Sequence, residues 1–258
     1  MILDEIVEST RLVVDRAEQI KPVSQLEEEI KTEAGPRGFA AALKVPGRVR
    51  IISELKKASP SGGLIRPDFV PESIAQMYET NGAAAVSILT DEKYFQGQLS
   101  FIKRVKDVIG LPALRKDFMI DPYQFYEARA AGADCILLIV QILSDDQIRD
   151  FLDLTIELGM DALVETHSET EIERALAAGA KLLGINNRDL DTLEVSLDTT
   201  RKFRSLVPDG PTLVSESGIK TADDMRKLRD WGVDAALIGE SLMRSENPGV
   251  LLSELANA

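Results

Sequence analysis

Cysteine and histidine are almost absent from this sequence: its 258 residues include one of each, Cys135 and His167. One cysteine excludes an internal disulfide and a cysteine-cluster metal site, and one histidine leaves no second imidazole for a zinc site. We therefore expect a metal-free protein of the reducing cytoplasm. Cys135 opens a predicted strand and is interpreted as a small core residue.

Basic residues are outnumbered by acidic ones, 30 against 43, which gives a formal net charge of −13. Long-range repulsion opposes binding to nucleic acid or to an anionic membrane surface, so an anionic ligand has to be met by local groups. Long apolar runs are missing too, and no segment approaches the length of a membrane span. Because Asp4, Glu5 and Glu8 stand among the first apolar residues, we expect neither a signal peptide nor a transit peptide.

A regular alternation of apolar strands and helices is what the chain has in quantity. Glycine-containing turns, 20 to 31 residues apart, separate each helix from the next strand at Gly82, Gly110, Gly132, Gly159, Gly179, Gly210 and Gly232. Glycine is favoured there because a helix end often needs a left-handed residue, and the spacing is that of one strand–helix unit. Seven turns and an opening strand predict eight strands.

The predicted strands cover residues 49–55, 84–89, 112–116, 135–140, 161–165, 182–186, 211–215 and 235–239. Eight such units in about 210 residues favour an α/β fold of the closed (β/α)8 TIM-barrel type over an open sheet. The first strand is not followed by a Gly-x-Gly-x-x-Gly motif, which argues against a dinucleotide-binding fold.

Residues 1–45 precede the first strand and form a predicted N-terminal helical extension. Apolar residues at three- and four-residue spacing predict a helix over 2–20, and Ser24-Gln25-Leu26-Glu27 is a capping box that predicts the start of a second helix, closed by Gly35-Pro36. Residues 39–43 form another short turn. Since no Gly/Ser linker follows, we expect residues 1–258 to be a single barrel domain. We expect the extension to cover the barrel mouth and to be dispensable for folding; the alternative is that it plugs the other end.

The carboxyl ends of the strands form the working face of such a barrel. Six of the eight predicted strand ends carry polar or charged residues: Glu54 and Lys56, Lys116 and Asp117, Glu165 and His167, Asn186 to Arg188, Ser215 to Gly218, and Gly239 to Ser241. The second and fourth strands end in mostly apolar residues. This segregation predicts a polar site at the mouth. We expect His167 to cap the next helix or to face solvent.

Two sub-sites follow from the chemistry of these residues. Ser217-Gly218 and Gly239-Glu240-Ser241 offer backbone N–H groups beside small side chains, as in many barrel phosphate sites. The Glu240 carboxylate then has to point away from the phosphate. A second group of residues can hold a proton near a carbonyl oxygen with a base beside it. It consists of Glu54, Lys56, Lys116 and Glu165.

Six motifs in order along the chain resemble those of a known family. They are Glu54-Leu55-Lys56-Lys57-Ala58-Ser59-Pro60-Ser61-Gly62, Leu114-Arg115-Lys116-Asp117-Phe118, Leu163-Val164-Glu165, Gly184-Ile185-Asn186-Asn187-Arg188-Asp189-Leu190, Ser215-Glu216-Ser217-Gly218 and Leu237-Ile238-Gly239-Glu240-Ser241. Through them the sequence resembles indole-3-glycerol phosphate synthase, a barrel enzyme of tryptophan biosynthesis, over almost its whole length. One departure is the loop at Gly62 and Gly63, where family members often have lysine.

The resemblance implies that 1-(2-carboxyphenylamino)-1-deoxyribulose 5-phosphate closes to indole-3-glycerol phosphate with loss of CO2 and water. It implies that Lys116 is the general acid at the ketone oxygen, and that Glu165, assisted by Glu54 and Lys56, handles the protons of dehydration. No step requires a metal or another cofactor. The partner implied is this small phosphorylated substrate, with no nucleic acid and no membrane, for a protein that is a monomer or a weak homodimer.

The same resemblance assigns the remaining site residues. It places the anthranilate part of the substrate near Asn186 and Arg188, the phosphate near Ser59, and the aromatic ring against Phe118 and Leu190. The implied catalytic residues are Glu54, Lys56, Lys116, Glu165, Asn186 and Ser217. The implied substrate- and phosphate-binding residues are Ser59, Phe118, Arg188, Leu190, Glu216, Gly218, Gly239 and Glu240.

Two other functions are compatible with a barrel of this kind. A phosphoribosylanthranilate isomerase would bind a related sugar, but it needs a cysteine and an aspartate at strand carboxyl ends, whereas Cys135 stands at the start of a predicted strand. A barrel that only binds phosphosugars would not need Glu54, Lys116 and Glu165 together.

Overall fold

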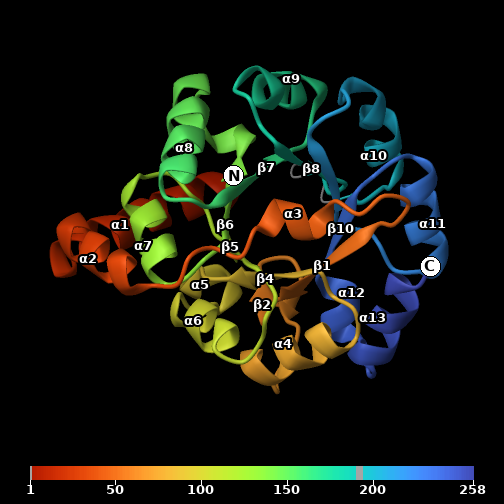
Figure 1. Cartoon of the computed structure of the whole chain (residues 1–258), viewed down its shortest axis with the longest axis horizontal. Coiled ribbons are helices and arrows are strands. Elements are labelled where there is room, and N and C mark those ends of the chain that lie inside the picture. Colours follow the sequence, from red (N-terminus) through yellow and green to blue (C-terminus); the bar gives the residue numbers. More distant parts are fainter. Residues whose placement is uncertain (1, 190–193) are drawn as a thin grey trace.

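Eight parallel strands close into a barrel in the computed structural model, which describes residues 2–189 and 194–258 (Figure 1). The barrel strands are β1 (Arg50–Leu55), β4 (Ala85–Leu89), β5 (Ala113–Lys116), β6 (Cys135–Ile139), β7 (Asp161–Thr166), β8 (Leu182–Asn186), β9 (Thr212–Glu216) and β10 (Ala235–Ile238). Each pairs with the next along the chain, and β10 pairs with β1. The predicted (β/α)8 TIM barrel is confirmed, and every strand end lies within one residue of its predicted position.

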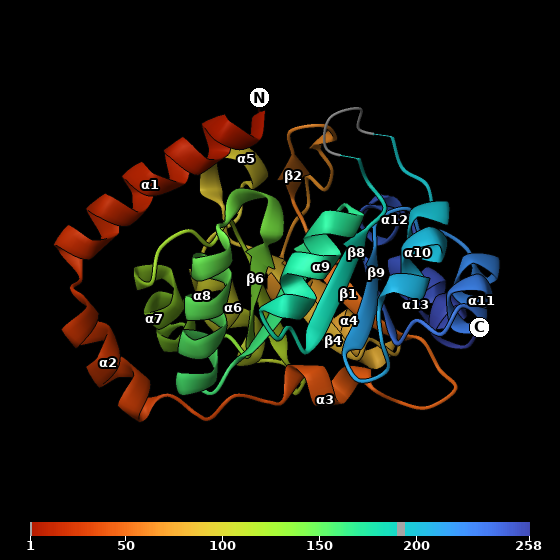
Figure 2. The ribbon, with the colours of Figure 1, turned by 90° about the horizontal axis from the view of Figure 1, so that it is seen from above.

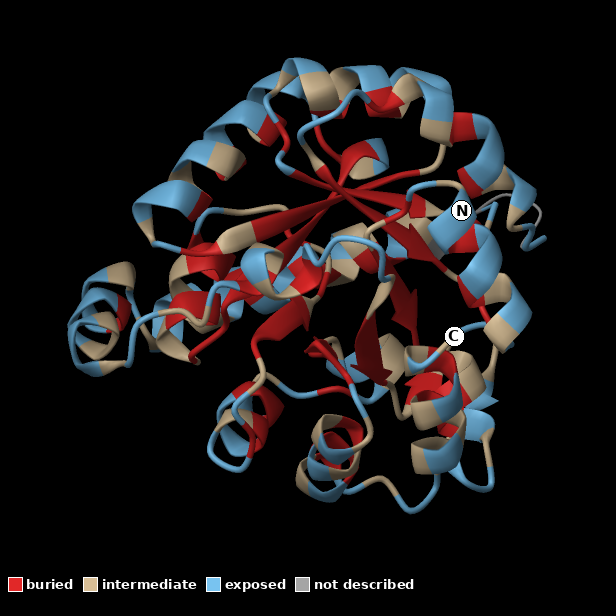
Figure 3. Cartoon of the chain, turned by 45° about the vertical axis from the view of Figure 1, so that its right-hand side comes forward, coloured by how far each residue is buried: buried red, intermediate tan, exposed pale blue. Residues whose placement is uncertain are grey.

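Helices surround the barrel, with exposed residues on their outer sides and buried residues toward the strands (Figure 3). They are α4 (Pro71–Thr80), α5 (Glu92–Phe95), α6 (Ser100–Lys106), α7 (Tyr123–Ala130), α8 (Asp145–Glu157), α9 (Glu169–Ala177), α10 (Asp198–Phe203), α11 (Ala222–Asp230), α12 (Glu240–Arg244) and α13 (Pro248–Ala256), with short 3-10 turns η1 (Val140–Ile142) and η2 (Arg204–Leu206). A two-stranded hairpin follows β1 and joins β2 (Ala58–Ser59) to β3 (Gly63–Leu64). The sequence did not predict this hairpin.

The strands are buried on both faces, so their alternating side chains enter two separate cores. Inward-facing residues such as Ile52, Leu114 and Leu163 fill the barrel, together with Cys135. Outward-facing residues such as Val164 pack against the helices. This two-sided burial explains why the strands read as continuous apolar runs. It also confirms Cys135 as a core residue with no exposed surface.

Left-handed glycines stand in most of the predicted turns that separate a helix from the next barrel strand. Six of the seven glycines named above have positive φ, and Gly110 is the exception. At Gly82, for example, φ is +99°, a value that an L-residue with a Cβ rarely adopts. These turns bring each strand back into the barrel after its helix.

The extension consists of α1 (Ile2–Ile20), α2 (Val23–Thr32) and α3 (Phe39–Leu43). The predicted capping box at Ser24 is wrong: the residue before α2 is Pro22, and no side chain caps the helix. Pro22 is itself the N-cap, in extended backbone, and Val23 is the first helical residue, so Ser24 already lies inside the helix. The helix also ends at Thr32, before Gly35.

The last part of the extension plugs the amino-terminal end of the barrel. Figure 2 shows α3 at the end opposite the β2–β3 hairpin. Phe39 and Leu43 have no exposed surface and belong to the inner core of the barrel. The backbone N–H of Ala40 donates to Asp161 Oδ2 at 2.8 Å, and that of Arg37 donates to Asp134 Oδ1 at 2.7 Å. These contacts belong to the core, so residues 37–43 are not a dispensable cover.

The first part of the extension runs back along the outside of the barrel toward the mouth. Val14 of α1 packs with Leu26 of α2 and Tyr123 of α7. Near its amino-terminal end, α1 lies beside α5, where Tyr94 Oη donates to the Glu5 carbonyl oxygen at 3.4 Å (Figure 2). The extension therefore both plugs one end and reaches the other. Within the described residues, no helix is long and apolar enough to cross a membrane.

Phe39→Ala should lower the free energy of unfolding by about 3 to 5 kcal/mol, because it leaves a cavity in the closed end of the barrel. Denaturant titration followed by circular dichroism measures the change. Val13→Ala is the matched control, since Val13 is 62% exposed on α1; its effect should stay within about 0.5 kcal/mol. Equal effects of the two substitutions would contradict the plug.

Candidate active site

Four ionisable side chains from four strands meet at the carboxyl end of the barrel: Glu54 of β1, Lys116 of β5, Glu165 of β7 and Glu216 of β9. Alternate residues of a barrel strand face its axis, so these side chains point inward and their neighbours point to the helices. Arg115 shows the outward direction, because its guanidinium pairs with Glu127 of α7 at 2.8 Å. Strand geometry alone therefore assembles the cluster.

Lys116 lies at the centre of this cluster. Its ammonium nitrogen is 3.2 Å from Glu165 Oε2 and 3.7 Å from Glu216 Oε2. Glu54 Oε1 lies 2.7 Å from the ammonium nitrogen of Lys56, which follows β1. Glu165 uses its other oxygen, Oε1, to accept a hydrogen bond from Asn186 Nδ2 at 3.1 Å. The structure thus brings together five of the six predicted catalytic residues and Glu216.

The charges of this cluster fix one another's protonation. Burial opposes ionisation of Glu54, but Lys56 and Lys116 outweigh it and lower the pKa of Glu54. Burial also opposes ionisation of Glu165, and the positive charge of Lys116 and its contacts with His167 lower its pKa below the usual range. Burial disfavours charged Lys116, yet the surrounding carboxylates raise its pKa. Both glutamates are ionised at neutral pH, and the lysine is charged.

Glu216 is the exception among the carboxyl groups. Burial, followed by the charge of Glu165, raises the pKa of Glu216 well above its usual range. Its Oε1 atom is buried and has no hydrogen-bond partner among the described residues. Glu216 is therefore the carboxyl group of the cluster that most readily holds a proton.

Two glycines make room for these carboxyl groups. A Cβ atom at Gly184 of β8 would collide with Glu216 Oε1, and one at Gly239 would collide with Glu54 Oε1. Gly239 was predicted as a phosphate-site residue, whereas no role was predicted for Gly184. Its position in the middle of a strand, where glycine is unfavourable, is the signal that could have found it.

The predicted phosphate-site segments lie on three loops that contact one another. Ser241 Oγ donates to the Ile219 carbonyl oxygen at 2.7 Å and joins the loops after β9 and β10. Arg244 Nη2 donates to the Gly62 carbonyl oxygen at 3.1 Å and joins the β2–β3 hairpin to α12. In that hairpin, Ser59 Oγ accepts from the Gly62 N–H at 3.0 Å. The chain therefore places Ser59 in a turn at the edge of this region.

The remaining predicted binding residues lie around the rim. Glu240 directs its carboxylate to Arg244 at 2.9 Å and to Arg188 at 3.6 Å. The ring of Phe118 lies 6.2 Å from that of Phe95, measured between centroids, and forms an apolar wall. Leu190 lies outside the described residues.

Ser217 and Gly218 adopt left-handed backbone conformations, with φ of +68° and +84°. Left-handed backbone is unfavourable for serine and needs support from its surroundings. Asn187 Nδ2 supplies this support by donating to the Ser217 carbonyl oxygen at 3.0 Å and to Ser215 Oγ at 2.9 Å. Its Oδ1 atom accepts from the backbone N–H and the hydroxyl of Thr200. The sequence did not indicate this network, because its members are distant along the chain.

His167 was expected to cap α9 or to face solvent, and both expectations are wrong. Ser168 caps α9, since its hydroxyl accepts from the Glu171 N–H at 3.3 Å. The side chain of His167 is 9% exposed and lies between two carboxylates. Its Nε2 atom is 3.3 Å from Glu165 Oε1, and its Nδ1 atom is 3.5 Å from Glu171 Oε2. The carboxylates of Glu165 and Glu171 therefore hold the His167 ring toward the protein interior.

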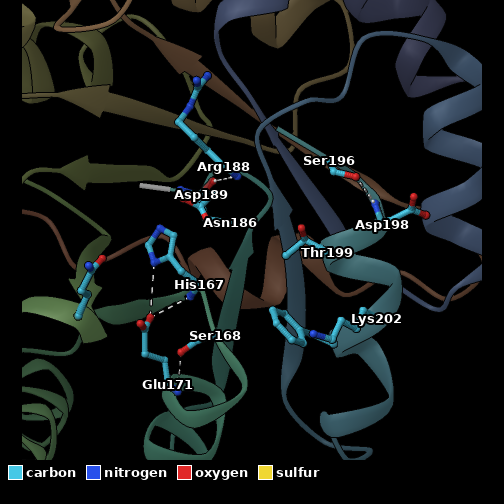
Figure 4. A pocket seen from close by; sticks show the side chains of 12 residues that line it. His167, Ser168, Glu171, Asn186, Arg188, Asp189, Ser196, Asp198, Thr199 and Lys202 are labelled. Carbon is cyan, nitrogen blue, oxygen red and sulfur yellow. Dashed lines mark hydrogen bonds and ion pairs between the residues drawn. The ribbon is translucent and has the colours of Figure 1, made fainter. Parts of the chain in front are cut away.

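A cavity of about 470 Å³ adjoins this histidine (Figure 4). His167, Ser168 and Glu171 line one side of it, and Asn186 and Arg188 connect it to the barrel mouth. On the opposite side lie residues of α10, among them Lys202. Within residues 2–189 and 194–258, no group of three or more histidine, cysteine, aspartate or glutamate side chains could hold a metal ion.

A protein-family model described as indole-3-glycerol phosphate synthase matches residues 3–255. A curated relative of that name from Polaromonas sp. (strain JS666 / ATCC BAA-500) is 47% identical over 257 residues, which cover 98% of this chain and 97% of the relative. Another, from Laribacter hongkongensis (strain HLHK9), is 45% identical over 258 residues, 98% of each chain.

Solved structures of other enzymes have a similar fold. The 3-hexulose-6-phosphate synthase of Salmonella typhimurium matches with a TM-score of 0.65 at 14% identity, over 81% of this chain and 97% of that one. The thiamine phosphate pyrophosphorylase of Pyrococcus furiosus matches with a TM-score of 0.60 at 18% identity, over 81% and 94%. At these identities the likeness concerns the fold alone.

Asn187→Ala should lower the free energy of unfolding by about 1 to 3 kcal/mol, because it leaves buried partners without hydrogen bonds. Urea denaturation measures this effect. Asn257→Ala is the matched control: Asn257 makes one exposed hydrogen bond to the Ser253 carbonyl oxygen. If the two variants are equally stable, the Asn187 network does not support the Ser217 turn.

Proposed function

The chain belongs to the indole-3-glycerol phosphate synthase family, and on this premise we propose which residues carry out each step of the reaction. The protein is a decarboxylating carbon–carbon lyase of tryptophan biosynthesis. It closes 1-(2-carboxyphenylamino)-1-deoxyribulose 5-phosphate to indole-3-glycerol phosphate, with release of CO2 and water. The relatives cover 98% of the chain, so neither an isomerase nor a non-catalytic barrel is needed to explain the motifs.

Lys116 is the general acid of ring closure in this proposal. Its ammonium group protonates the ketone oxygen while the aromatic carbon that bears the carboxylate attacks the carbonyl carbon. Loss of CO2 then restores the aromatic ring. The observation that carries this assignment is the position of Lys116 among Glu54, Glu165 and Glu216, which keep it charged although it is largely buried. An acid in such a place stabilises the negative charge that develops on the oxygen.

Glu165 serves as the base of dehydration, with Glu54 and Lys56 assisting. It is ionised and held 3.2 Å from the ammonium of Lys116, so a proton that it takes from carbon can return to the acid. Lys56, 2.7 Å from Glu54, brings a second ammonium group to the same mouth. We propose Ser217 as the last member of the catalytic set, because its left-handed turn brings it to the end of β9.

The substrate carries a carboxylate and a phosphate, and a chain of net charge −13 has to bind both with local groups. Asn186 and Arg188 orient the anthranilate part, and Phe118 with Leu190 flanks its ring. Ser59, Gly218, Gly239 and the backbone at Glu240 hold the phosphate, supported by the contacts between their loops. Glu216 is included among the substrate-binding residues because its Oε2 atom lies 3.7 Å from the Lys116 ammonium nitrogen at the barrel mouth.

We further propose that residues 1–258 act as one domain, because α3 completes the barrel core. The low cysteine content supports the cytoplasm as its location. The net charge of −13 argues against nucleic-acid and membrane partners. A monomer or weak homodimer is the quaternary state proposed.

Lys116→Met should lower kcat by about 100- to 10,000-fold, the contribution of a positioned general acid. Indole fluorescence follows turnover, and circular dichroism verifies folding. Lys103→Met is the matched control, because Lys103 lies on α6 and its side chain is 60% exposed beside Asp107. Near-normal turnover of a folded Lys116→Met variant would remove Lys116 from the mechanism.

Activity should be unchanged after exhaustive treatment with EDTA, because the proposed steps use ammonium and carboxyl groups alone. The assay compares kcat and KM before treatment, after it, and after addition of divalent ions. Loss of activity that a divalent ion restores would contradict this assignment.

A further inference from the structure

We propose that His167 and Glu171 form a charged clamp that holds the carboxylate of Glu165 ionised and oriented toward Lys116. His167 is then a positioning residue, since it acts through Glu165 and not on the substrate. This inference rests on the proposed role of Glu165 as a base. It gives a function to a histidine that the sequence had assigned to a helix cap or to solvent.

The geometry of Glu165 is the first argument. Its Oε2 atom faces the Lys116 ammonium at 3.2 Å. Its Oε1 atom faces Asn186 Nδ2 at 3.1 Å and His167 Nε2 at 3.3 Å. The carboxylate thus has one positive group on each side. Without His167, only the neutral amide of Asn186 would remain on the Oε1 side. That amide alone would oppose rotation of the Glu165 carboxylate toward Lys116.

Glu171 holds the histidine in this place. Its Oε2 atom accepts from the backbone N–H of His167 at 2.9 Å and lies 3.5 Å from Nδ1 of the same residue. Glu171 is itself fixed in the first turn of α9, where Ser168 accepts from its N–H. A negative side chain is favourable at this position, because the amino-terminal end of a helix is positive. Figure 4 shows His167 and Glu171 facing each other at the cavity wall.

Two carboxylates around one imidazole decide its charge. Burial alone would favour neutral histidine, but Glu165 and Glu171 outweigh burial and raise the pKa of His167 to about 10. The pKa of Glu165 is lowered, so transfer of the histidine proton to it is strongly uphill. His167 therefore acts as a fixed cation rather than as a proton donor.

Other charged groups around His167 do not reverse this balance. Lys116 and Glu216 lie beyond Glu165 and form a pair of opposite sign at 3.7 Å. The cavity beside the ring is lined by two basic and two acidic side chains besides Glu171: Arg188, Asp189, Asp198 and Lys202. Within the described residues, Glu165 and Glu171 are the two carboxylates that lie within ion-pair distance of the His167 ring.

The charge of the clamp can be measured directly, because His167 is the one histidine of the chain and gives a single imidazole signal by NMR. We expect a titration midpoint near 10 in the protein as it stands. Glu171→Gln should lower this midpoint by about one pH unit or more, since it removes an adjacent negative charge. Glu169→Gln is the matched control: Glu169 is exposed in the same helix turn, and within the described residues it forms no ion pair with His167. A midpoint near the ordinary value of about 6.5 would overturn the clamp.

The functional part of the proposal is tested by kcat as a function of pH. His167→Gln, which has no charge at this position, should lower kcat by about 10- to 100-fold, the range for a misplaced catalytic group, with a smaller change in KM. His167→Lys, which keeps the charge, should retain more activity. In Glu171→Gln, kcat should fall as pH rises through the NMR midpoint of that variant, because the imidazolium is lost there, and should approach the level of His167→Gln.

A kcat of Glu171→Gln that stays constant through its own NMR midpoint would overturn the proposal. Equal losses in His167→Gln and His167→Lys would do the same, because they would indicate a packing role. The NMR titration does not depend on catalysis, so it still decides whether the clamp exists if Lys116→Met shows the proposed mechanism to be wrong.

Discussion

The carboxyl groups of Glu54, Glu165 and Glu216 are buried next to the ammonium group of Lys116 at the barrel mouth. The rest of the site depends on how the charges of these four groups are balanced. Burial of an uncompensated charge costs several kcal/mol. Glu54 and Glu165 can be ionised there because Lys116 lies among them, and Glu216 can join them because it holds a proton readily. Lys56 and His167 add positive charge from the edge. A change at one member therefore alters the proton affinity of the others, and the cluster acts as a unit.

The barrel backbone is shaped to hold this cluster. Glycine weakens a strand, yet Gly184 stands in the middle of β8, where any side chain would occupy the place of the Glu216 carboxyl group. Gly239 does the same for Glu54. At the end of β9, a left-handed serine is tolerated because Asn187 holds its carbonyl. At the opposite end, Phe39 and Leu43 complete the inner core, so apolar side chains fill the barrel beneath its polar mouth. The free-energy cost of these unfavourable backbone positions at the mouth is thus offset by apolar packing elsewhere in the barrel.

The barrel, its strand ends and most of the mouth could be predicted because they follow from local periodicity. The strand–helix rhythm places Lys116 at the carboxyl end of a strand, and the structure then shows Lys116 pointing inward and Arg115 outward. The features that escaped prediction depend on how the folded chain turns its side chains, and some of them on contacts across the fold. His167 precedes a helix-starting run, and nothing local shows that Glu165, two residues earlier, turns back toward it. Asn187 gains its partners from β9 and α10. The hairpin β2–β3 lies in a loop whose turn residues gave no strand pattern.

The proton balance of the reaction explains why the mouth needs an acid and a base at the same time. Two protons reach the former ketone oxygen, one at ring closure and one as it leaves as water, and one proton is removed from the neighbouring carbon. The substrate carboxylate leaves as neutral CO2, so each turnover takes up one proton from solvent. In the proposed scheme Glu165, 3.2 Å from Lys116, returns the proton from carbon to the acid, and a single proton has to cross the mouth. A base that serves this exchange has to stay ionised until it meets the carbon-bound proton. Lys116 on one side and the His167 imidazolium on the other keep Glu165 ionised.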